Sequence, residues 1–180
     1  MNNNNPKEIE NERKDNMANK NPDEVFVMLL SNLRQGAEQS TKFYQEVSSF
    51  VQDPDIKEAL ESRAFISNKI LDTIDECFRL INEKPVKATG RLYDIFIEDF
   101  RKEINEIQNP RARRLYVLAK LNHLINLRKG EYLALIAAAD LTGHYGVGVL
   151  LESALADKTV FSERIRRLVR ERLMERAAGA

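Results

Sequence analysis

Three Asn-Pro or Asp-Pro pairs that each precede a long apolar pattern constrain the fold of this chain more than any other feature. They are Asn21-Pro22, Asp53-Pro54 and Asn109-Pro110. An Asn or Asp side chain caps the first turn of a helix, and proline suits the first helical position because the N–H it lacks would be unpaired there. Each pair is followed by apolar residues spaced three and four apart, which predicts a helix with one buried face.

Apolar periodicity predicts an all-α domain. The expected helices span residues 22–51, 54–81, 89–107, 110–130, 133–155 and 161–173. Arg128-Lys129-Gly130 resembles a helix C-terminus, and Asp157-Lys158-Thr159 is expected to break the helix before it. The short link between the first two helices predicts an antiparallel hairpin.

Composition sets the class of protein. A chain of 180 residues is long enough for one domain with a full core. Lys and Arg number 28, as do Asp and Glu, so net charge favours neither nucleic acid nor an anionic membrane as a partner. The single cysteine, Cys77, excludes an intrachain disulfide and fits a reducing compartment. No apolar run approaches the ~20 residues of a membrane span. We therefore expect a soluble, cytoplasmic protein.

The chain begins with a polar segment rich in Asn, Lys and Glu. We expect residues 1–20 to form a disordered tail, with Met17 a candidate natural start, and residues 21–178 to form a single helical domain.

Residues 133–148, read L-A-L-I-A-A-A-D-L-T-G-H-Y-G-V-G, form the most apolar stretch of the chain. It also contains Asp140, His144 and Tyr145, so it predicts a helix that is mostly buried and presents polar groups to something specific. Asp140 and His144 are four residues apart. We expect them to pair with each other or with Arg63 in a polar cluster within the core, because buried polar groups need partners.

The same stretch resembles the A-L-I-A-A-A-x-x-x-E-H-Y-E signature of the YciE/YciF-type ferritin-like proteins of bacteria. The resemblance covers residues 29–155, with an extra helical insertion around 109–129. The matching segments are Ala37-Glu38, Asp53-Pro54, Leu60-Glu61, Phe78-x-Leu80, residues 135–139 and His144-Tyr145. It implies a ferritin-like antiparallel four-helix bundle with one or two additional helices. It also implies a link to stress responses, frequent dimerisation and a candidate dinuclear metal centre.

The residues at the signature's polar positions argue against that metal centre. Both acids of E-H-Y-E are replaced, by Gly143 and Gly146, and the family histidine of the second helix falls on Arg63. A dinuclear bundle site takes a Glu from each of two helices and a Glu-x-x-His pair from each of the other two. The residues three positions before His123 and His144 are Lys and Leu, so neither histidine completes such a pair.

The sequence therefore predicts no intact dinuclear site and no cofactor. The alternative is a rearranged iron or manganese site, for which Glu38, Glu61, Asp140 and His144 supply the carboxylate and imidazole ligands that these metals accept.

The last predicted helix contains six arginines. They are Arg164, Arg166, Arg167, Arg170, Arg172 and Arg176. Arg166, Arg167 and Arg170 are candidates for contact with a phosphate backbone or an acidic partner. We favour a solvated face neutralised by neighbouring glutamates, so nucleic-acid binding is not expected.

No catalytic Ser-His-Asp pattern, Cys-His pairing or glycine-rich nucleotide loop appears, and no small-molecule substrate is indicated. We therefore expect a non-enzymatic, stress-associated structural or interaction protein. Apolar surface on the later helices and the family resemblance both favour a homodimer.

Overall fold

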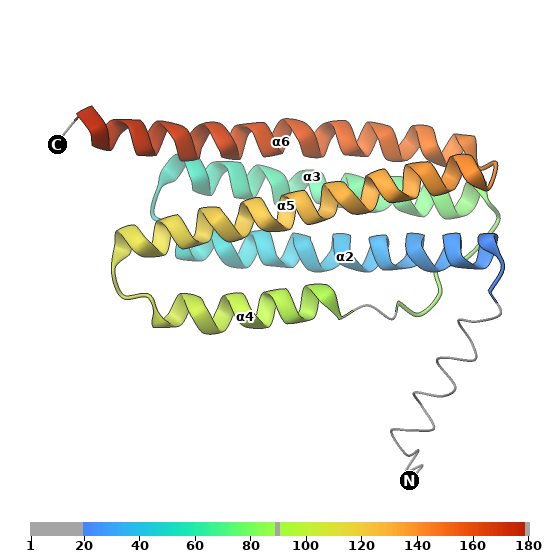
Figure 1. Cartoon of the computed structure of the whole chain (residues 1–180), viewed down its shortest axis with the longest axis horizontal. Helices are drawn as coiled ribbons and strands as arrows, with labels where there is room; N and C mark the ends of the chain where they lie inside the picture. The colour runs from blue at the N-terminus through green and yellow to red at the C-terminus, as the bar shows by residue number, and fades with distance from the viewer. Residues whose placement is uncertain (1–19, 89–90, 179–180) are drawn as a thin grey trace, which may run out of the picture.

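The computed structural model describes residues 20–88 and 91–178, and helices account for most of them (Figure 1). They are α2 (Pro22–Phe50), α3 (Pro54–Leu80), α4 (Leu92–Glu106), α5 (Pro110–Leu141) and α6 (Tyr145–Ala178). The described residues contain no strand, which confirms the all-α prediction. Residues 1–19, Met17 among them, and the expected start of the third helix at Thr89 or Gly90 lie outside the described residues.

The three helices that follow the Asx-Pro pairs begin as predicted. At the start of α2, Glu24 N–H donates to Asn21 Oδ1 at 2.8 Å, and Asn21 N–H donates to Glu24 Oε2 at 2.9 Å, which forms a capping box. Asp53 before α3 and Asn109 before α5 each accept hydrogen bonds from two N–H groups of the first turn. The caps satisfy donors that the helix itself leaves unpaired.

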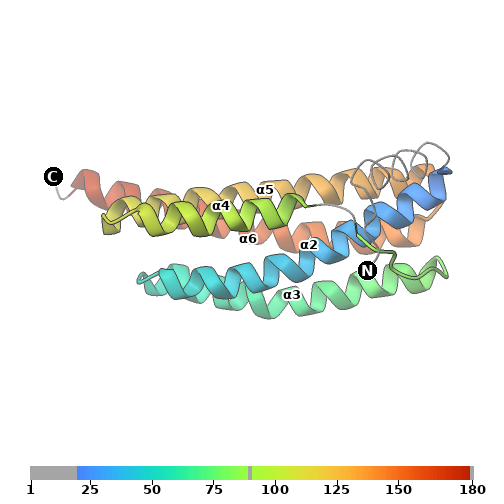
Figure 2. The same ribbon diagram turned by 90° about the horizontal axis from the view of Figure 1, so that it is seen from below.

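The four long helices form an antiparallel bundle, as Figures 1 and 2 show. The α2–α3 hairpin packs beside the α5–α6 hairpin, with α3 against α6 and α2 against α5. The shorter α4 lies outside the bundle, against α2 and α5. This is the predicted four-helix bundle with an additional helix. No helix among the described residues is both long enough and apolar enough to cross a membrane.

Two predicted helix boundaries are wrong. α5 continues through Gly130, and α6 continues through 157–159, so three predicted helices become two longer ones. A glycine inside a helix costs only about 1 kcal/mol, and packing readily overrides that preference. Here Arg128 and Tyr132 are buried on both sides of Gly130, and Lys158 is itself buried. Residues 109–129 are therefore the cap and first part of a core helix rather than an inserted one.

The predicted helix at 133–148 is also wrong, because a turn divides it between α5 and α6. Gly143 lies in this turn with φ +75°, a left-handed conformation that favours glycine. Leu141 is 89% exposed and Tyr145 is 67% exposed. Gly148 is buried where α6 starts along α5, and a Cβ there would lie 3.8 Å from Ala139 Cβ. The stretch thus forms a helical corner, not a buried rod.

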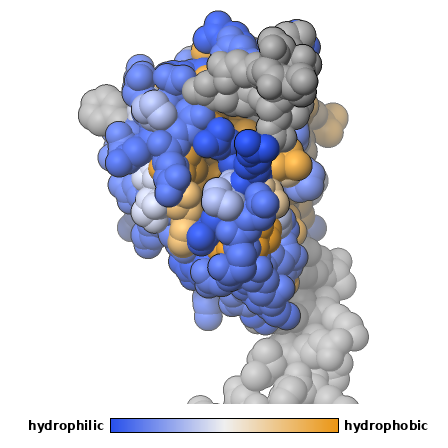
Figure 3. Space-filling view, turned by 90° about the vertical axis from the view of Figure 1, so that its left-hand side faces the viewer, coloured by the Kyte–Doolittle hydropathy of each residue, from blue (hydrophilic) through white to orange (hydrophobic). Residues whose placement is uncertain are grey.

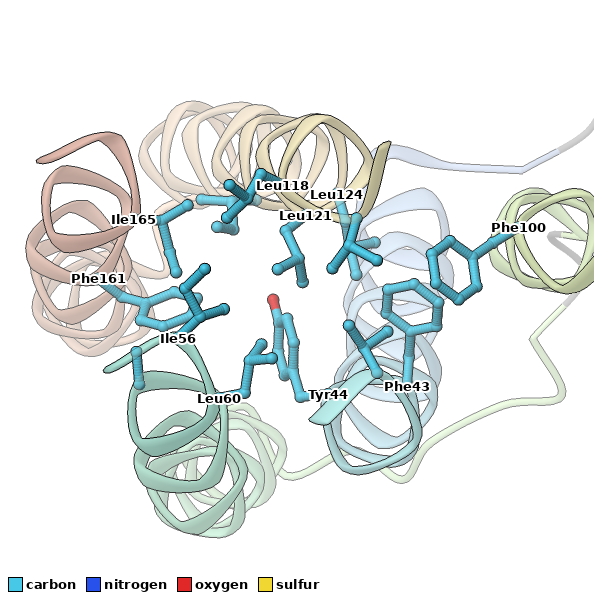
Figure 4. Close-up of a cluster of buried hydrophobic side chains, with 14 of the residues drawn as sticks. Phe43, Tyr44, Ile56, Leu60, Phe100, Leu118, Leu121, Leu124, Phe161 and Ile165 are labelled. Carbon is cyan, nitrogen blue, oxygen red and sulfur yellow. The ribbon is translucent and has the colours of Figure 1, made fainter. Parts of the chain in front are cut away.

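The core consists of two apolar clusters placed end to end. One surrounds Tyr44, Leu60 and Phe161, and the other surrounds Ala37, Ile70 and Tyr132. Figure 4 shows the first cluster, with Phe100 of α4 facing Phe43 of α2. From the end at which α2 passes into α3, hydrophobic residues show inside a hydrophilic rim (Figure 3).

Candidate functional site

Three basic side chains are buried at the middle of the bundle, between the two apolar clusters. Arg63 of α3 is 2% exposed, Arg128 of α5 is 1% exposed and Lys158 of α6 is 6% exposed. On each helix the basic residue lies between members of one cluster and members of the other. We call these three residues the cationic centre. Buried charges are costly unless they are paired, so such a group requires an explanation.

Arg128 makes hydrogen bonds through both terminal nitrogens of its guanidinium and links three helices. Its Nη2 donates to Leu33 O at 3.0 Å, and its Nη1 donates to Tyr93 Oη at 3.2 Å and to Glu131 Oε2 at 2.6 Å. Gly36 leaves room for this contact, because a Cβ there would lie 2.5 Å from Tyr93 Cε2 and closer still to Arg128 Nη1. Arg128 thereby fastens α4 to α2 and α5.

Arg63 and Lys158 contact aromatic rings, and within residues 20–88 and 91–178 neither forms an ion pair with an acid. The Arg63 guanidinium carbon lies 5.2 Å from the Phe161 ring centroid, and Lys158 Nζ lies 4.7 Å from the Tyr132 ring centroid. Cation–π contacts offset part of the cost of burial. Nevertheless, Arg63 Nε and Nη1 and the hydroxyl of Tyr132 are buried without a hydrogen-bond partner among the described residues.

Burial and mutual repulsion act on the acid–base groups of this centre. Burial, and then the positive charges of Arg128 and Arg63, lower the pKa of Lys158 well below its usual 10.5. Burial raises the pKa of Tyr132 to about 12, although the two arginines oppose the shift. The interior therefore disfavours further positive charge, and the tyrosines remain neutral.

A pH-dependent stability difference follows from the lowered pKa of Lys158. The unfolded chain binds a proton at this amine up to pH near 10.5, whereas the folded chain releases it at lower pH. Unfolding therefore takes up a proton, and the stability of the folded state rises with pH. We expect Lys158→Met to have a larger free energy of unfolding than the wild type at pH 7, in a buffer without chloride, so that no small anion can pair with the buried amine. This difference should shrink as the pH approaches 9.5.

Urea unfolding at several pH values measures that difference. Because wild type and variant share every other titrating group, only Lys158 contributes to the change. Lys102→Met, at an exposed position, serves as control and should differ from the wild type by a constant amount. A pH-independent difference for Lys158→Met would show that the folded protein keeps this amine protonated.

The structure does not assemble the predicted metal ligands. Glu38 is partly exposed and pairs with Arg34 on its own helix. The Glu61 side chain is 58% exposed and lies 4.0 Å from Lys57. His144 Nε2 is 3.6 Å from Asp23 Oδ1, and its ring centroid is 5.1 Å from that of Phe26. Each predicted ligand has its own separate neighbours.

The predicted polar cluster of Arg63, Asp140 and His144 is likewise not formed. Asp140 is exposed at the end of α5, and a turn separates it from His144. Neither an ion pair nor a hydrogen bond joins their side chains among the described residues. His144 also lies far from Arg63. Lys158 is beside Arg63 in the cationic centre, and it follows His144 by fourteen residues, which is roughly 20 Å along a helix.

The residues of the bundle centre do not fit the dinuclear metal that the fold implies. Such a centre needs several anionic oxygens around two divalent cations. Here the corresponding interior holds two arginines and a lysine, with Glu131 at its edge. Within residues 20–88 and 91–178, no three His, Cys, Asp or Glu side chains gather closely enough to hold a metal ion.

The arginines of α6 lie on a face that carries both signs of charge. Arg166 pairs with Glu163 at 2.7 Å, and Arg167 lies 3.8 Å from Glu171. Arg164 pairs with Glu58 of α3 at 3.0 Å. Arg170 is exposed. Exposed pairs of this kind contribute little to stability, and they reduce the positive potential available to a phosphate backbone.

Comparison with solved structures places the bundle in a class. YcfI of Rhodopseudomonas palustris, described as a candidate structural protein, matches with a TM-score of 0.78 and 18% identity, over 82% of this chain and 94% of that one. The Escherichia coli stress protein YciF matches with a TM-score of 0.77 and 18% identity, over 83% and 94% of the two chains. A protein from Xanthomonas campestris pv. campestris matches with a TM-score of 0.63 and 15% identity, over 88% and 99%. The fold is therefore that of the YciF-like, ferritin-like helical bundles.

A family model confirms the resemblance at the level of sequence. The model described as "Domain of unknown function (DUF892)" matches residues 21–178. The chain belongs to this family. No curated protein sequence matches the chain.

Proposed function

We propose that this chain is a cytoplasmic ferritin-like bundle protein with a structural or interaction role in the stress response, and that it works without a dinuclear metal centre and without enzymatic activity. The observation that carries the proposal is the cationic centre. Two divalent ions cannot replace Arg63, Arg128 and Lys158 without carboxylates to hold them. The description of YciF as a stress protein and the structural role attributed to YcfI support the biological part of the proposal.

A homodimer is part of the same proposal. Large apolar side chains on the outer faces of α5 and α6 are more than half exposed. They are Leu115, Leu133, Leu141, Tyr145, Val149 and Val160. Large exposed apolar side chains are typical of surfaces that meet another chain.

Elemental analysis tests the proposal. The full chain, purified from cells grown with added iron and manganese, should contain far less than one equivalent of either metal per chain. Solution light scattering on the same sample should give a mass near twice 20.7 kDa. The rival hypothesis, a rearranged site using Glu38, Glu61, Asp140 and His144, requires stoichiometric metal that is lost in Asp140→Ala. Finding such metal would overturn the proposal.

A further inference from the structure

The charges of the bundle centre do not balance. Glu131 is the acid that pairs with Arg128, and its side chain is 26% exposed. Asp157, exposed on α6, is the other acid whose charge acts on Lys158. Arginine does not lose its proton in a protein, so even a neutral Lys158 leaves Arg63 charged. Among the described residues, no acid lies within 4.0 Å of Arg63. Excess positive charge therefore remains around Arg63.

Unused donors surround the same point. In the part of the chain that the structure describes, the buried donors around it that lack a hydrogen-bond partner are Arg63 Nε and Nη1, Arg128 Nε and the Tyr132 hydroxyl. Figure 4 shows the Tyr44 hydroxyl pointing from α2 toward the middle of the bundle. Natural proteins leave few buried donors unpaired, and several in one place indicate a bound partner. A partner that suits only donors and positive charge is an anion.

We propose that the cationic centre binds a small monovalent inorganic anion of the chloride class, between the Arg63 guanidinium and the Lys158 ammonium, with the Tyr44 hydroxyl as a further donor. The anion takes the place that two metal cations would occupy in a bundle lined with acids. It balances Arg63 and favours the protonated form of Lys158.

The small free volume of the cationic centre favours a small ion over a large one. About 160 Å³ of space is left between the atoms of the residues around the centre, and none of it forms a cavity that holds a water molecule. These residues are Tyr44, Arg63, Ile125, Arg128, Lys158 and Phe161. An ion can enter only when the side chain of Arg63 or Lys158 shifts. Arg63 also lines an open groove of about 330 Å³ between α3 and α6, beside Lys69 and Arg164. The groove gives an anion a route to Arg63, and a tetrahedral oxyanion needs a larger displacement than a halide.

The test is the dependence of stability on chloride. The full chain is unfolded by heat in gluconate buffer, with chloride replacing gluconate up to about 0.15 M at constant ionic strength, so that screening stays fixed. A ligand that binds only the folded state raises the Tm in a saturable way. We expect such a rise of a few degrees with chloride and bromide, and no rise with sulfate.

Matched arginine variants locate the effect. Arg63→Met should abolish the response to chloride, whereas Arg164→Met, which removes a more exposed arginine from the rim of the same groove, should retain it. A wild-type Tm that does not depend on chloride would overturn the proposal, as would an undiminished response in Arg63→Met.

Crystals of the wild type soaked in bromide give a readout that does not depend on variants. We expect an anomalous peak in contact with Arg63 and Lys158. Peaks confined to surface arginines would overturn the proposal. The two proposals can fail independently. A protein without metal in the elemental analysis can still show no response to chloride, which would overturn the anion site and leave the proposed structural role standing.

Discussion

Replacing Arg128 by methionine should lower the free energy of unfolding by about 3 kcal/mol or more, because it breaks a fully buried and well-paired site. The variant leaves the Leu33 carbonyl and the Tyr93 hydroxyl without their donor, and Glu131 without its cation. An unsatisfied buried group costs about 1–3 kcal/mol, and methionine restores the packing volume but none of the hydrogen bonds. Urea unfolding followed by circular dichroism at pH 7 measures the loss.

Arg63→Met provides the matched control, since Arg63 is equally buried but lacks hydrogen bonds at Nε and Nη1. In chloride-free buffer this substitution should be neutral or stabilising, because replacing an unpaired buried charge with an apolar side chain removes a desolvation cost. Equal destabilisation by the two substitutions would contradict the distinction drawn between a paired and an unpaired arginine.

Gly36→Ala should lower the free energy of unfolding by about 1–3 kcal/mol, the usual cost of overpacking a core. The new methyl group would lie 2.5 Å from Tyr93 Cε2 and would also meet Arg128 Nη1. Tyr93 is 6% exposed and Arg128 is held by several hydrogen bonds, so neither can move without losing contacts. The expected local consequence is a weaker attachment of α4, visible as faster amide exchange in 92–106.

Gly130→Ala is the control for that experiment. A Cβ at Gly130 has no neighbour within 4 Å, and the residue lies in the interior of α5. Alanine favours the helix over glycine by up to about 1 kcal/mol, so this variant should be stabilised. The opposite signs of the two substitutions separate close packing at Gly36 from helix propensity. If both substitutions lower the free energy of unfolding, helix propensity does not determine the effect of Gly130→Ala and this prediction is wrong.

The fold was largely predictable because local signals and the apolar pattern agree. Asn21, Asp53 and Asn109 cap helices in the structure as their sequence context predicts. The errors occurred where a polar or flexible residue lies inside a helix. Gly130 and Lys158 look like helix breaks in the sequence. In the structure Gly130 stands two residues from the buried Arg128 and Tyr132, and Lys158 stands three residues before the buried Phe161, so tertiary packing outweighs local preference there.

The cationic centre was only partly predictable. The sequence predicts Arg63 in the core, but it places Arg128 at a helix end and Lys158 at a helix break. A signal for both was present in the spacing: Arg128 stands four residues before the buried Tyr132, and Lys158 stands three before the buried Phe161. Charged residues on an apolar stripe are usually solvated, and only the meeting of α3, α5 and α6 shows that these are not.

The predicted pairing of Asp140 with His144 failed for a different reason. The i,i+4 spacing brings side chains together only within a continuous helix. The left-handed turn at Gly143 ends α5 and directs His144 toward Asp23 of α2. A glycine two residues beyond the last helical residue is a C-terminal signal that the apolar pattern obscured.

Anomalous diffraction from crystals grown with manganese tests the central claim most directly. The cationic centre predicts no manganese peak between α2, α3, α5 and α6, with Arg63, Arg128 and Lys158 filling that space. Two neighbouring peaks bridged by carboxylate oxygens inside the bundle would contradict it.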